Sequence, residues 1–354
     1  MLFDDVCIES IGYSLPDDVV ASEEIEDCLA PLYDRLRLPM GRLELMTGIR
    51  ERRFFPRGAR PSQISALSGA RAIEAADIDP SRIGALIHGS VCRDYLEPAT
   101  ACSVHHALGL SPRCHLYDVS NACLGILTGA LQVAHLIQAG VIEAGMVVGS
   151  ELGRPLVERT IEHLNADESL SRQDVKQFFA SLTIGSASAA ILLTHRNVSA
   201  AGTALLGAAT LAHTEAHALC QSDGLTEFMR TDSEQLLHSG VSAAIDTFDI
   251  LLERLKWQRS DVQRTICHQV GAAHRKLMLE GLELPEETDY ATFETLGNTG
   301  SAALPVALAM AAADGTLQAG ENVALLGIGS GIICQMAGLR WGATRVAGGP
   351  AHLA

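Results

Sequence analysis

A cysteine at position 123 stands where an expected strand passes into an expected helix. The segment reads DVSNACLG over Asp118–Gly125, follows the apolar pair Leu116–Tyr117, and leads into a helical pattern that continues to about Gln138. Free backbone N–H groups and the positive end of a helix favour a thiolate at such a junction, and the thiolate is the reactive form of cysteine. The pattern therefore indicates a nucleophile. It also fits a small thiol buried at the start of a helix.

Three other segments carry groups for the same chemistry. His268 lies in ICHQVGAAH after an expected strand, Asn298 lies between glycines in ETLGNTGSAALP, and Leu325–Gly331 reads LLGIGSG, a strand that ends in a glycine loop. A cysteine with a histidine and an asparagine can combine thiolate attack with two hydrogen-bond donors for an oxygen anion. Each segment alone also fits a structural role, since a lone histidine is commonly a half-buried imidazole and Asn298 fits a turn.

Two further segments carry charged side chains. The stretch TGIRERRFF, Thr47–Phe55, and its surroundings hold four arginines, which fit either a solvated basic turn or a local site for phosphate groups. They are Arg50, Arg52, Arg53 and Arg57. The polar loop RDYLEPAT, Arg93–Thr100, contains Glu97, which the residues alone describe as an exposed loop acid.

Composition limits the class of protein. The chain has 354 residues, of which 47% are apolar, with a net charge of −16 and a pI of about 5.2. A large core is possible, and the negative net charge disfavours a long-range attraction to nucleic acid or an anionic membrane, although a local basic patch can still bind an anionic ligand. Nine cysteines without framework spacing and an acidic N-terminus favour reduced thiols in the cytoplasm. The apolar run Ser301–Ala313 is too short to span a bilayer, and His213, His217 and His274 form no metal-ligand set.

The chain alternates expected strands and helices. Strands are expected at Val6–Ser10, Ala85–Gly89, Gly145–Gly149, Ala189–Thr194 and Arg264–Cys267, helices at Ser22–Leu36, Ser62–Ala76 and Ser242–Leu255, a charged helical stretch at 151–182, and irregular structure at 200–240. Low aromatic content with abundant alanine and glycine favours helices packed closely on a parallel sheet.

The second half of the sequence repeats the first at a constant shift of 180 residues. The matching groups are Ile87-His88 with Cys267-His268, Gln138-Ala139-Gly140 with Gln318-Ala319-Gly320, and Gly149-Ser150 with Gly329-Ser330. We therefore predict two similar α/β halves joined by helical crossovers. Residues 1–182 would carry the nucleophile and a cap insertion, and residues 183–354 would carry the histidine and the asparagine. A site between the halves would use loops at the carboxyl ends of their strands.

Together these segments resemble the ketosynthase III enzymes of the thiolase superfamily. The blocks DVSNACLG, ICHQVG, ETLGNTGSAALP and LLGIGSG match that family in order and spacing, and TGIRERR is similar to its N-terminal block. The resemblance covers nearly the whole chain. It implies an α/β thiolase fold, five-layered α/β/α/β/α with two pseudo-symmetric halves, in an acyltransferase that forms homodimers.

The resemblance also implies roles for individual residues. Cys123 would be the acylated nucleophile, His268 and Asn298 would stabilise an enolate oxygen, and the backbone N–H groups of Cys123 and Ser330 would form the oxyanion hole. Arg50 is the candidate contact to coenzyme A. No cofactor is implied, because acyl-CoA is the substrate. Two positions depart from the family, since Arg42 stands where many members have a tryptophan and Met46 replaces an arginine.

The loop SVCRDYLEPATA, Ser90–Ala101, is similar to a loop of the OleA-type acyl-CoA condensing enzymes of olefin biosynthesis, as are MLFDDV and PLYDRL. In that subfamily the matching glutamate, here Glu97, reaches across the dimer to the partner's cysteine and acts as a base. A malonyl group forms its carbanion by losing carbon dioxide, whereas a plain acyl thioester must lose an α-proton and needs a base. The charge of Glu97 would also repel a malonate.

The resemblance therefore implies a non-decarboxylative Claisen condensation of two fatty acyl-CoA molecules to a 2-alkyl-3-keto acid, for head-to-head hydrocarbon or β-lactone biosynthesis. Downstream pathway enzymes are possible partners. The alternatives are a decarboxylative 3-oxoacyl-ACP synthase III that uses acyl-CoA and malonyl-ACP, an ester-forming acyltransferase, and a non-catalytic subunit, which would lack the cysteine. The segments Glu151–Phe179 and 200–240 are candidates for an acyl tunnel wall and a dimer contact.

Overall fold

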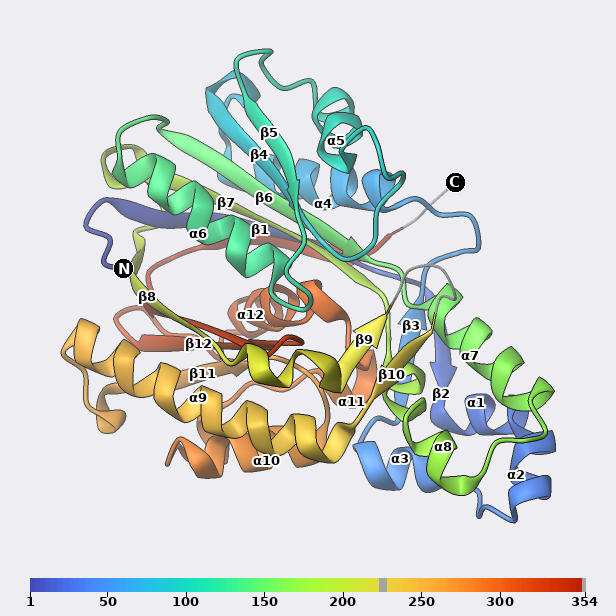
Figure 1. Ribbon diagram of the computed structural model, residues 1–354. Coiled ribbons are helices and arrows are strands. Elements are labelled where there is room, and N and C mark those ends of the chain that lie inside the picture. The colour runs from blue at the N-terminus through green and yellow to red at the C-terminus, as the bar shows by residue number, and fades with distance from the viewer. Residues whose placement is uncertain (223–227, 352–354) are drawn as a thin grey trace.

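The strands of both repeats lie side by side in one large mixed sheet. The computed structural model describes residues 1–222 and 228–351, and within them the sheet has ten strands (Figure 1). The order is β11 (Arg264–Cys267), β12 (Asn322–Gly329), β13 (Ile333–Arg340), β8 (Thr203–Ala212), β1 (Val6–Leu15), β7 (Ala187–His195), β6 (Ala144–Glu151), β4 (Ile83–Gly89) and β5 (His115–Val119), with β14 (Arg345–Pro350) also pairing with β1. Strands β1 and β8 pair through only two residue pairs, so the sheet is narrow where the halves meet.

The two halves follow one plan, as the shift of 180 residues predicts. Strands β4 and β6 run parallel, as do β11 and β12. The next strand in each half, β7 or β13, returns antiparallel to its neighbour. The matched pairs Gly149-Ser150 and Gly329-Ser330 lie at the ends of β6 and β12. The duplication is confirmed, while the boundary between residues 1–182 and 183–354 stays a prediction.

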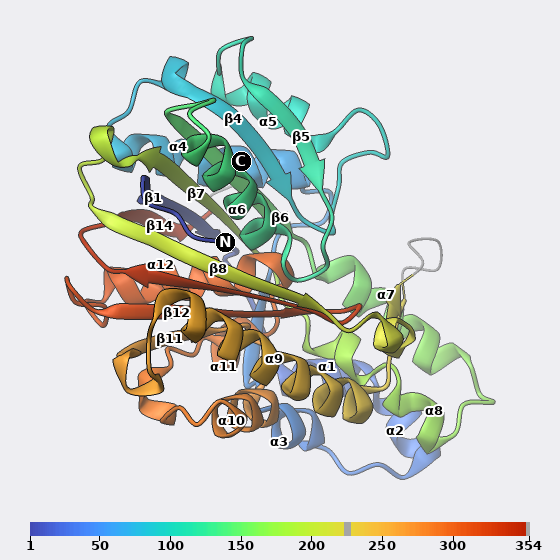
Figure 2. The same cartoon turned by 60° about the vertical axis from the view of Figure 1, so that its left-hand side comes forward.

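Helices cover both faces of each half and form the expected five layers. Helices α4 (Pro61–Ala76) and α5 (Thr100–Leu108) form one outer layer, and α9 (Ser233–Leu255) and α10 (Ala272–Gly281) form the other. Helices α6 (Gly125–Gln138) and α12 (Ala303–Ala313) lie between the two halves of the sheet (Figures 1 and 2). Helix α12 reads ALPVALAMAAA and is buried on nearly every side, because a helix between two sheet halves has no face toward water.

Short elements form a cap beside the layers. They are β2 (Asp18–Ala21), α1 (Ser22–Cys28), α2 (Ala30–Leu36), α3 (Arg42–Thr47), β3 (Glu51–Phe54), α7 (Arg154–Ala166) and α8 (Arg172–Lys176), around an apolar cluster that includes Leu32, Leu164 and Phe178. The single helix expected over Ser22–Leu36 is wrong in one respect, because it breaks at Leu29. Pro31 cannot donate the hydrogen bond that a continuous helix would need, and it starts α2 instead.

The expectation of irregular structure over residues 200–240 is wrong for most of that range. It contains β8, the hairpin strands β9 (Cys220–Ser222) and β10 (Met229–Thr231), and the start of α9; residues 223–227 lie outside the described part. Strand β8 reads TALLGAATLA without polar alternation, because both of its faces are largely covered. The remaining short helix is α11 (Phe293–Leu296), and no helix of the described residues is long and apolar enough to cross a membrane.

Candidate active site

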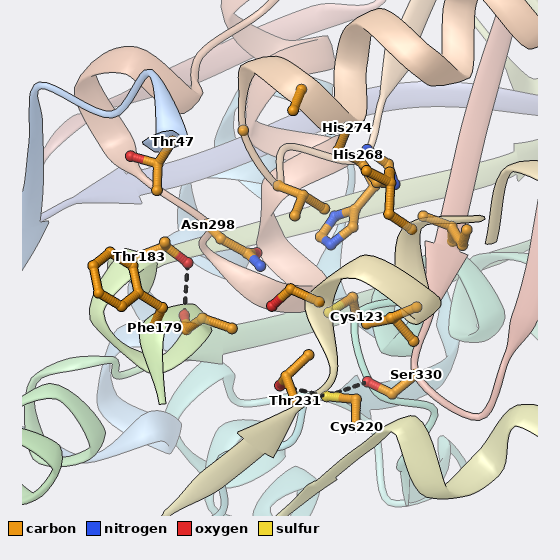
Figure 3. A pocket seen from close by; sticks show the side chains of 18 of the residues that line it. Thr47, Cys123, Phe179, Thr183, Cys220, Thr231, His268, His274, Asn298 and Ser330 are labelled. Atoms are coloured by element: carbon orange, nitrogen blue, oxygen red, sulfur yellow. Dashed lines mark hydrogen bonds between the residues drawn. The ribbon is translucent and has the colours of Figure 1, made fainter. Parts of the chain in front are cut away.

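A cavity of about 290 Å³ lies where the strand ends of both halves meet the cap and the β9–β10 hairpin. Cys123, His268, Asn298 and Ser330 all line it, so the structure brings four of the predicted residues together (Figure 3). The rest of the wall is largely apolar and includes Met46, Phe179, Ala180, Ile184, Met229, Leu236, Leu237, Val270, Ile328 and Ile332. From the expected tunnel segments, Glu151–Phe179 contributes Phe179, and the stretch 200–240 contributes more of the wall.

Cys123 lies in a tight turn between β5 and α6. Ala122 has a positive φ of 44°, and the N–H of Leu124 donates to the carbonyl of Asn121 at 2.9 Å. The turn places Cys123 just before the first residues of α6, where backbone N–H groups have no partner within the helix. The position before a helix was predicted correctly, and it leaves the Cys123 N–H available for an oxyanion.

The surroundings of Cys123 do not support the thiolate expected at this position. Burial, and then the nearby Glu151 and Cys220, raises the pKa of Cys123 to about 12. The free N–H groups at the start of α6 favour negative charge, but removal from water and a neighbouring carboxyl outweigh them. Cys123 is therefore a neutral thiol at neutral pH.

Two histidines face the cavity, and both are neutral. Burial, and then the neighbouring His274, lowers the pKa of His268 to about 3, and burial lowers that of His274 to about 4. The Nδ1 atoms of both rings are buried without a hydrogen-bond partner among the described residues. His268 follows β11, and its backbone N–H donates to the carbonyl of Leu326 at 3.0 Å. A neutral imidazole in this position can exchange hydrogen bonds with a substrate oxygen without carrying a charge.

Asn298 is held by its backbone and by one side-chain oxygen. Its N–H donates to the carbonyl of Thr183 at 2.9 Å, and its carbonyl accepts from the N–H of Gly185 at 2.9 Å. Its Oδ1 accepts from the N–H of Gly300 at 3.0 Å, which assigns the opposite end of the amide to the donor Nδ2. In Figure 3 the amide lies beside His268 and above Cys123. Asn298 therefore offers an N–H donor to the space in front of the thiol.

Ser330 lies at the end of β12 on the side of the cavity opposite Asn298. Its hydroxyl donates to the sulfur of Cys220 at 3.5 Å, and the hydroxyl of Thr231 donates to the same sulfur at 3.4 Å. These contacts tie the glycine loop after β12 to the β9–β10 hairpin. They hold Ser330 in place without using its backbone N–H.

Glu97 does not reach the cavity of its own chain. It is exposed, and it is absent from the described residues that line the cavity. Its loop also exposes large apolar side chains, with Leu96 92%, Val91 56% and Tyr95 50% exposed. Within one chain the structure therefore leaves Glu97 away from Cys123, and the predicted reach into a partner's site remains a prediction.

The four arginines near Thr47–Phe55 separate into different roles. Arg52 is fully buried and donates to the Ser22 hydroxyl at 3.1 Å; Arg53 donates to the Pro16 carbonyl, and Arg57 pairs with Glu158. The solvated basic turn is thus wrong for Arg52. The side chain of Arg50 is 57% exposed and lies 3.9 Å from the Glu51 carboxylate, outside the cavity lining.

Sequence reasoning missed three groups near the cavity. Cys220 lies in the stretch that was expected to be irregular, and His274 was considered only as a metal ligand. Glu151 is buried beside Cys123 although it falls in a charged segment. A signal existed for Glu151, because an acid at the end of a buried strand, as Glu151 is at the end of β6, is well placed for a site. The other two carried no comparable signal.

The five-layered fold and the thiol, imidazole and amide at one cavity define a thiolase-fold acyltransferase of the ketosynthase III type. Residues 252–341 match the family described as 3-oxoacyl-[acyl-carrier-protein (ACP)] synthase III C terminal. An acyl-CoA:acyl-CoA alkyltransferase from Shewanella oneidensis is 42% identical over 96% of this chain and 100% of its own length. One from Xanthomonas campestris is 32% identical over the same shares.

Solved structures agree with these relatives. Xanthomonas campestris OleA with bound lauric acid and lauroyl-CoA, in a cysteine-to-serine variant, superposes with a TM-score of 0.92 at 31% identity, over 96% of this chain and 100% of that one. A glutamate-to-glutamine variant of the same enzyme gives a TM-score of 0.93 at 31% identity, over 96% and 98% of the two chains. The chain belongs to the acyl-CoA:acyl-CoA alkyltransferase, or OleA, family.

Proposed function

We propose that this protein joins two fatty acyl-CoA molecules in a non-decarboxylative Claisen condensation that gives a 2-alkyl-3-keto acid. The observation that carries the proposal is the apolar cavity at which Cys123, His268 and Asn298 meet. The apolar wall suits fatty acyl chains, and the three polar groups suit the carbonyl chemistry of a thioester. The relatives' names and the lauroyl-CoA in a similar structure support the same substrate class.

The proposed reaction has two stages. Cys123 attacks the first acyl-CoA, and coenzyme A leaves with the proton of the thiol. The second acyl-CoA loses an α-proton, and its enolate oxygen accepts hydrogen bonds from His268 and Asn298. The enolate carbon attacks the acyl-cysteine, the N–H groups of Cys123 and Ser330 bind the oxyanion, and the cysteine sulfur departs. Hydrolysis of the remaining thioester then releases the β-keto acid.

We assign the base for the α-proton to Glu97 of a second subunit. Solved variants of Xanthomonas campestris OleA replace a glutamate in one case and a cysteine in another, and this cysteine lies 26 positions after the glutamate. In this chain Cys123 follows Glu97 by the same 26 positions. A carboxylate that is exposed in one chain, on a loop with exposed Leu96, Tyr95 and Val91, is well placed to enter a neighbour. The decarboxylative alternative has no use for such a base.

A homodimer is part of this proposal. Strand β5 is the edge of the sheet, with several exposed or half-exposed residues, and it leads directly to the Cys123 turn. An unpaired edge is a surface on which a second copy can add its own edge strand. Two copies joined there would bring the loop of Glu97 and the turn of Cys123 close to the same interface.

We also propose a cellular compartment, the lack of a cofactor and a contact to coenzyme A. All nine cysteines are free thiols, which fits the reducing cytoplasm. We propose no cofactor, since the acyl-CoA molecules supply all reacting groups. Arg50 remains the candidate contact to coenzyme A, because an exposed guanidinium near the cavity-lining residues Met46 and Thr47 can meet a phosphate.

One assay tests the function. The purified protein is incubated with myristoyl-CoA alone, the products are heated to decarboxylate β-keto acids, and gas chromatography is used to look for a ketone built from two chains. We expect this ketone without added malonate and a C123A control that forms none. A product that appears only when malonyl-ACP is supplied would select the 3-oxoacyl-ACP synthase III alternative.

A further inference from the structure

A buried carboxyl group, Glu151, lies at the end of β6 between two segments that carry predicted catalytic residues. It is 6% exposed. Its Oε1 accepts hydrogen bonds from the Ser301 hydroxyl at 2.5 Å, the Ser301 N–H at 3.3 Å and the Val91 N–H at 3.2 Å. Ser301 belongs to the turn of Asn298, and Val91 begins the loop that leads to Glu97. One carboxyl group therefore ties these two segments together.

The contact with the Asn298 turn is close. The N–H of Gly300 donates the hydrogen bond that fixes the Asn298 amide. Gly300 also packs against Glu151, because a Cβ added at Gly300 would lie 3.0 Å from Glu151 Cγ. The Ser301 hydroxyl that donates to Glu151 also lies 3.0 Å from the carbonyl of Gly89. A shift of the carboxyl group would therefore turn the amide that faces the thiol.

The contact with the nucleophile is electrostatic. The backbone of Gly89 and Ser90, beside Glu151, touches Gly125 at the start of α6, where a Cβ would lie 2.7 Å from the Gly89 carbonyl carbon. The backbone of Gly89 and Ser90 therefore lies between Glu151 and the Cys123 turn. After burial, it is the largest cause of the raised pKa of Cys123.

We propose that Glu151 is a positioning residue of the condensation, which holds the Asn298 turn against the start of the Glu97 loop and places a carboxyl group behind the Cys123 turn, across the backbone of Gly89 and Ser90. The part that concerns condensation rests on the proposed function. The part that concerns the thiol does not depend on any substrate.

Several other titratable groups face this pair. Cys92 lies against Glu151, and Cys220, His268 and His274 share the cavity with Cys123. Burial raises the pKa of Cys92 and lowers that of both histidines, so all three are uncharged at neutral pH. Burial raises the pKa of Glu151 above its ordinary value, and the hydrogen bonds from Ser301 and Val91, which favour the carboxylate, offset only part of this effect.

The E151Q variant separates charge from shape, because glutamine keeps an oxygen acceptor for Ser301 and Val91. The rate of iodoacetamide alkylation at Cys123 is followed by peptide mass spectrometry from pH 6 to pH 11, so that the other thiols do not interfere. We expect the profile of E151Q to move to lower pH by about one unit, because a neighbouring negative charge is gone. The S301A variant is the matched control, since it loses one hydrogen-bond donor but keeps the Glu151 carboxyl group, and in the alkaline part of the range, where a carboxyl group is ionised, its profile should overlie that of the wild type.

The condensation is tested with E151A, which loses both charge and acceptor. We expect the kcat for the ketone-forming reaction to fall about tenfold, with KM within about twofold and with coenzyme A still released in the first turnover. An E151Q profile that overlies the wild type would overturn the inference, as would an unchanged kcat in E151A. If E151A does not fold, the alkylation profiles of E151Q and S301A remain as the test of Glu151. Failure of the wild type to make ketone would count against the proposed function alone, because alkylation needs no substrate.

Discussion

At the residue scale, the groups that meet at the cavity are uncharged at neutral pH. The Cys123 thiol has a pKa of about 12, and the imidazoles of His268 and His274 have pKa values of about 3 and 4. A charge left unpaired in this apolar wall would be costly, whereas neutral donors are tolerated beside an acyl chain. In the proposed reaction, donors that are already in place would stabilise the oxyanion and the enolate.

Replacing Cys123 with alanine should stop the chemistry without preventing binding. The variant should still bind acyl-CoA by the apolar wall but release coenzyme A at least ~10³-fold more slowly than the wild type, since no other group supplies the sulfur. Free coenzyme A is measured by chromatography after mixing with myristoyl-CoA, and binding by calorimetry. Rapid coenzyme A release by C123A would mean that another residue is the nucleophile, and Cys220, whose thiol also lines the cavity, would be the first candidate.

The positions of the site residues were predictable, but their charge states were not. Cys123, His268 and Ser330 come after the strands β5, β11 and β12, and residues at such strand ends meet at one edge of a sheet; Asn298 instead lies in the glycine-containing turn GNTG after the short helix α11. The pKa of Cys123 depends on burial and on Glu151 and Cys220, which no local pattern connects with it. The sequence therefore predicted a thiolate from the helix start alone.

At the scale of elements, the start of α6 must approach the end of β4 closely. The residues in contact are Gly125 on α6 and Gly89 and Ser90 after β4, and a side chain on either glycine would meet backbone atoms within 3 Å. Backbone cannot move aside as a flexible side chain does. The two glycines therefore fix where α6 begins and, with it, where the Cys123 turn sits.

The G125A variant should displace that turn. A methyl group would lie 2.7 Å from the Gly89 carbonyl carbon, so we expect a loss of about 2 kcal/mol in the free energy of unfolding and at least ~10-fold slower acylation of Cys123. Urea unfolding and coenzyme A release measure the two effects. G140N is the control, because Gly140 at the other end of α6 has a φ of 71° with open space around it, and asparagine tolerates this conformation. Equal acylation in G125A and the wild type would argue against a fixed helix start.

Elements with a clear period were predicted more accurately than those buried on both faces. The helix expected over Ser62–Ala76 differs from α4 by one residue, because its polar and apolar positions alternate at a helical spacing. Strand β8 was missed because it lacks the polar alternation that marks a half-exposed strand. The elements that cover it are β1 and β13 beside it and α9 over it, and β1 and β13 come from distant parts of the chain. Pro31 was the overlooked signal for the break between α1 and α2.

At the scale of the whole molecule, the duplication repeats the framework and not the site. His88 occupies the position of His268 in the other half, but it is fully buried, lies outside the cavity lining and has no hydrogen-bond partner on either ring nitrogen among the described residues. Burial lowers the pKa of His88 to about 4. The position therefore faces the cavity in one half and the packed interior in the other.

The buried His88 should make the protein less stable in acid. The unfolded chain binds a proton at His88 below about pH 6.5, while the folded chain does not until about pH 4, so stability present above pH 6.5 is lost as the pH falls toward 4. The H88L variant should lose less stability than the wild type between pH 7 and pH 5, by about 2 kcal/mol. Urea unfolding at both pH values measures this difference, and an identical pH dependence in the two proteins would rule out a neutral buried His88.

In the proposed dimer, the roles of Glu97 and Cys123 can be separated between the two chains. If Glu97 serves the partner's cysteine, E97A should acylate but not condense, and C123A should do neither. Co-expressed with different tags, the two chains form mixed dimers in which one site combines Cys123 of one chain with Glu97 of the other. With random pairing we expect about a quarter of the wild-type ketone yield. If Glu97 acted within its own chain, or not at all, the mixture would give no more ketone than the E97A protein alone, and tandem purification of the mixed dimer makes that comparison direct.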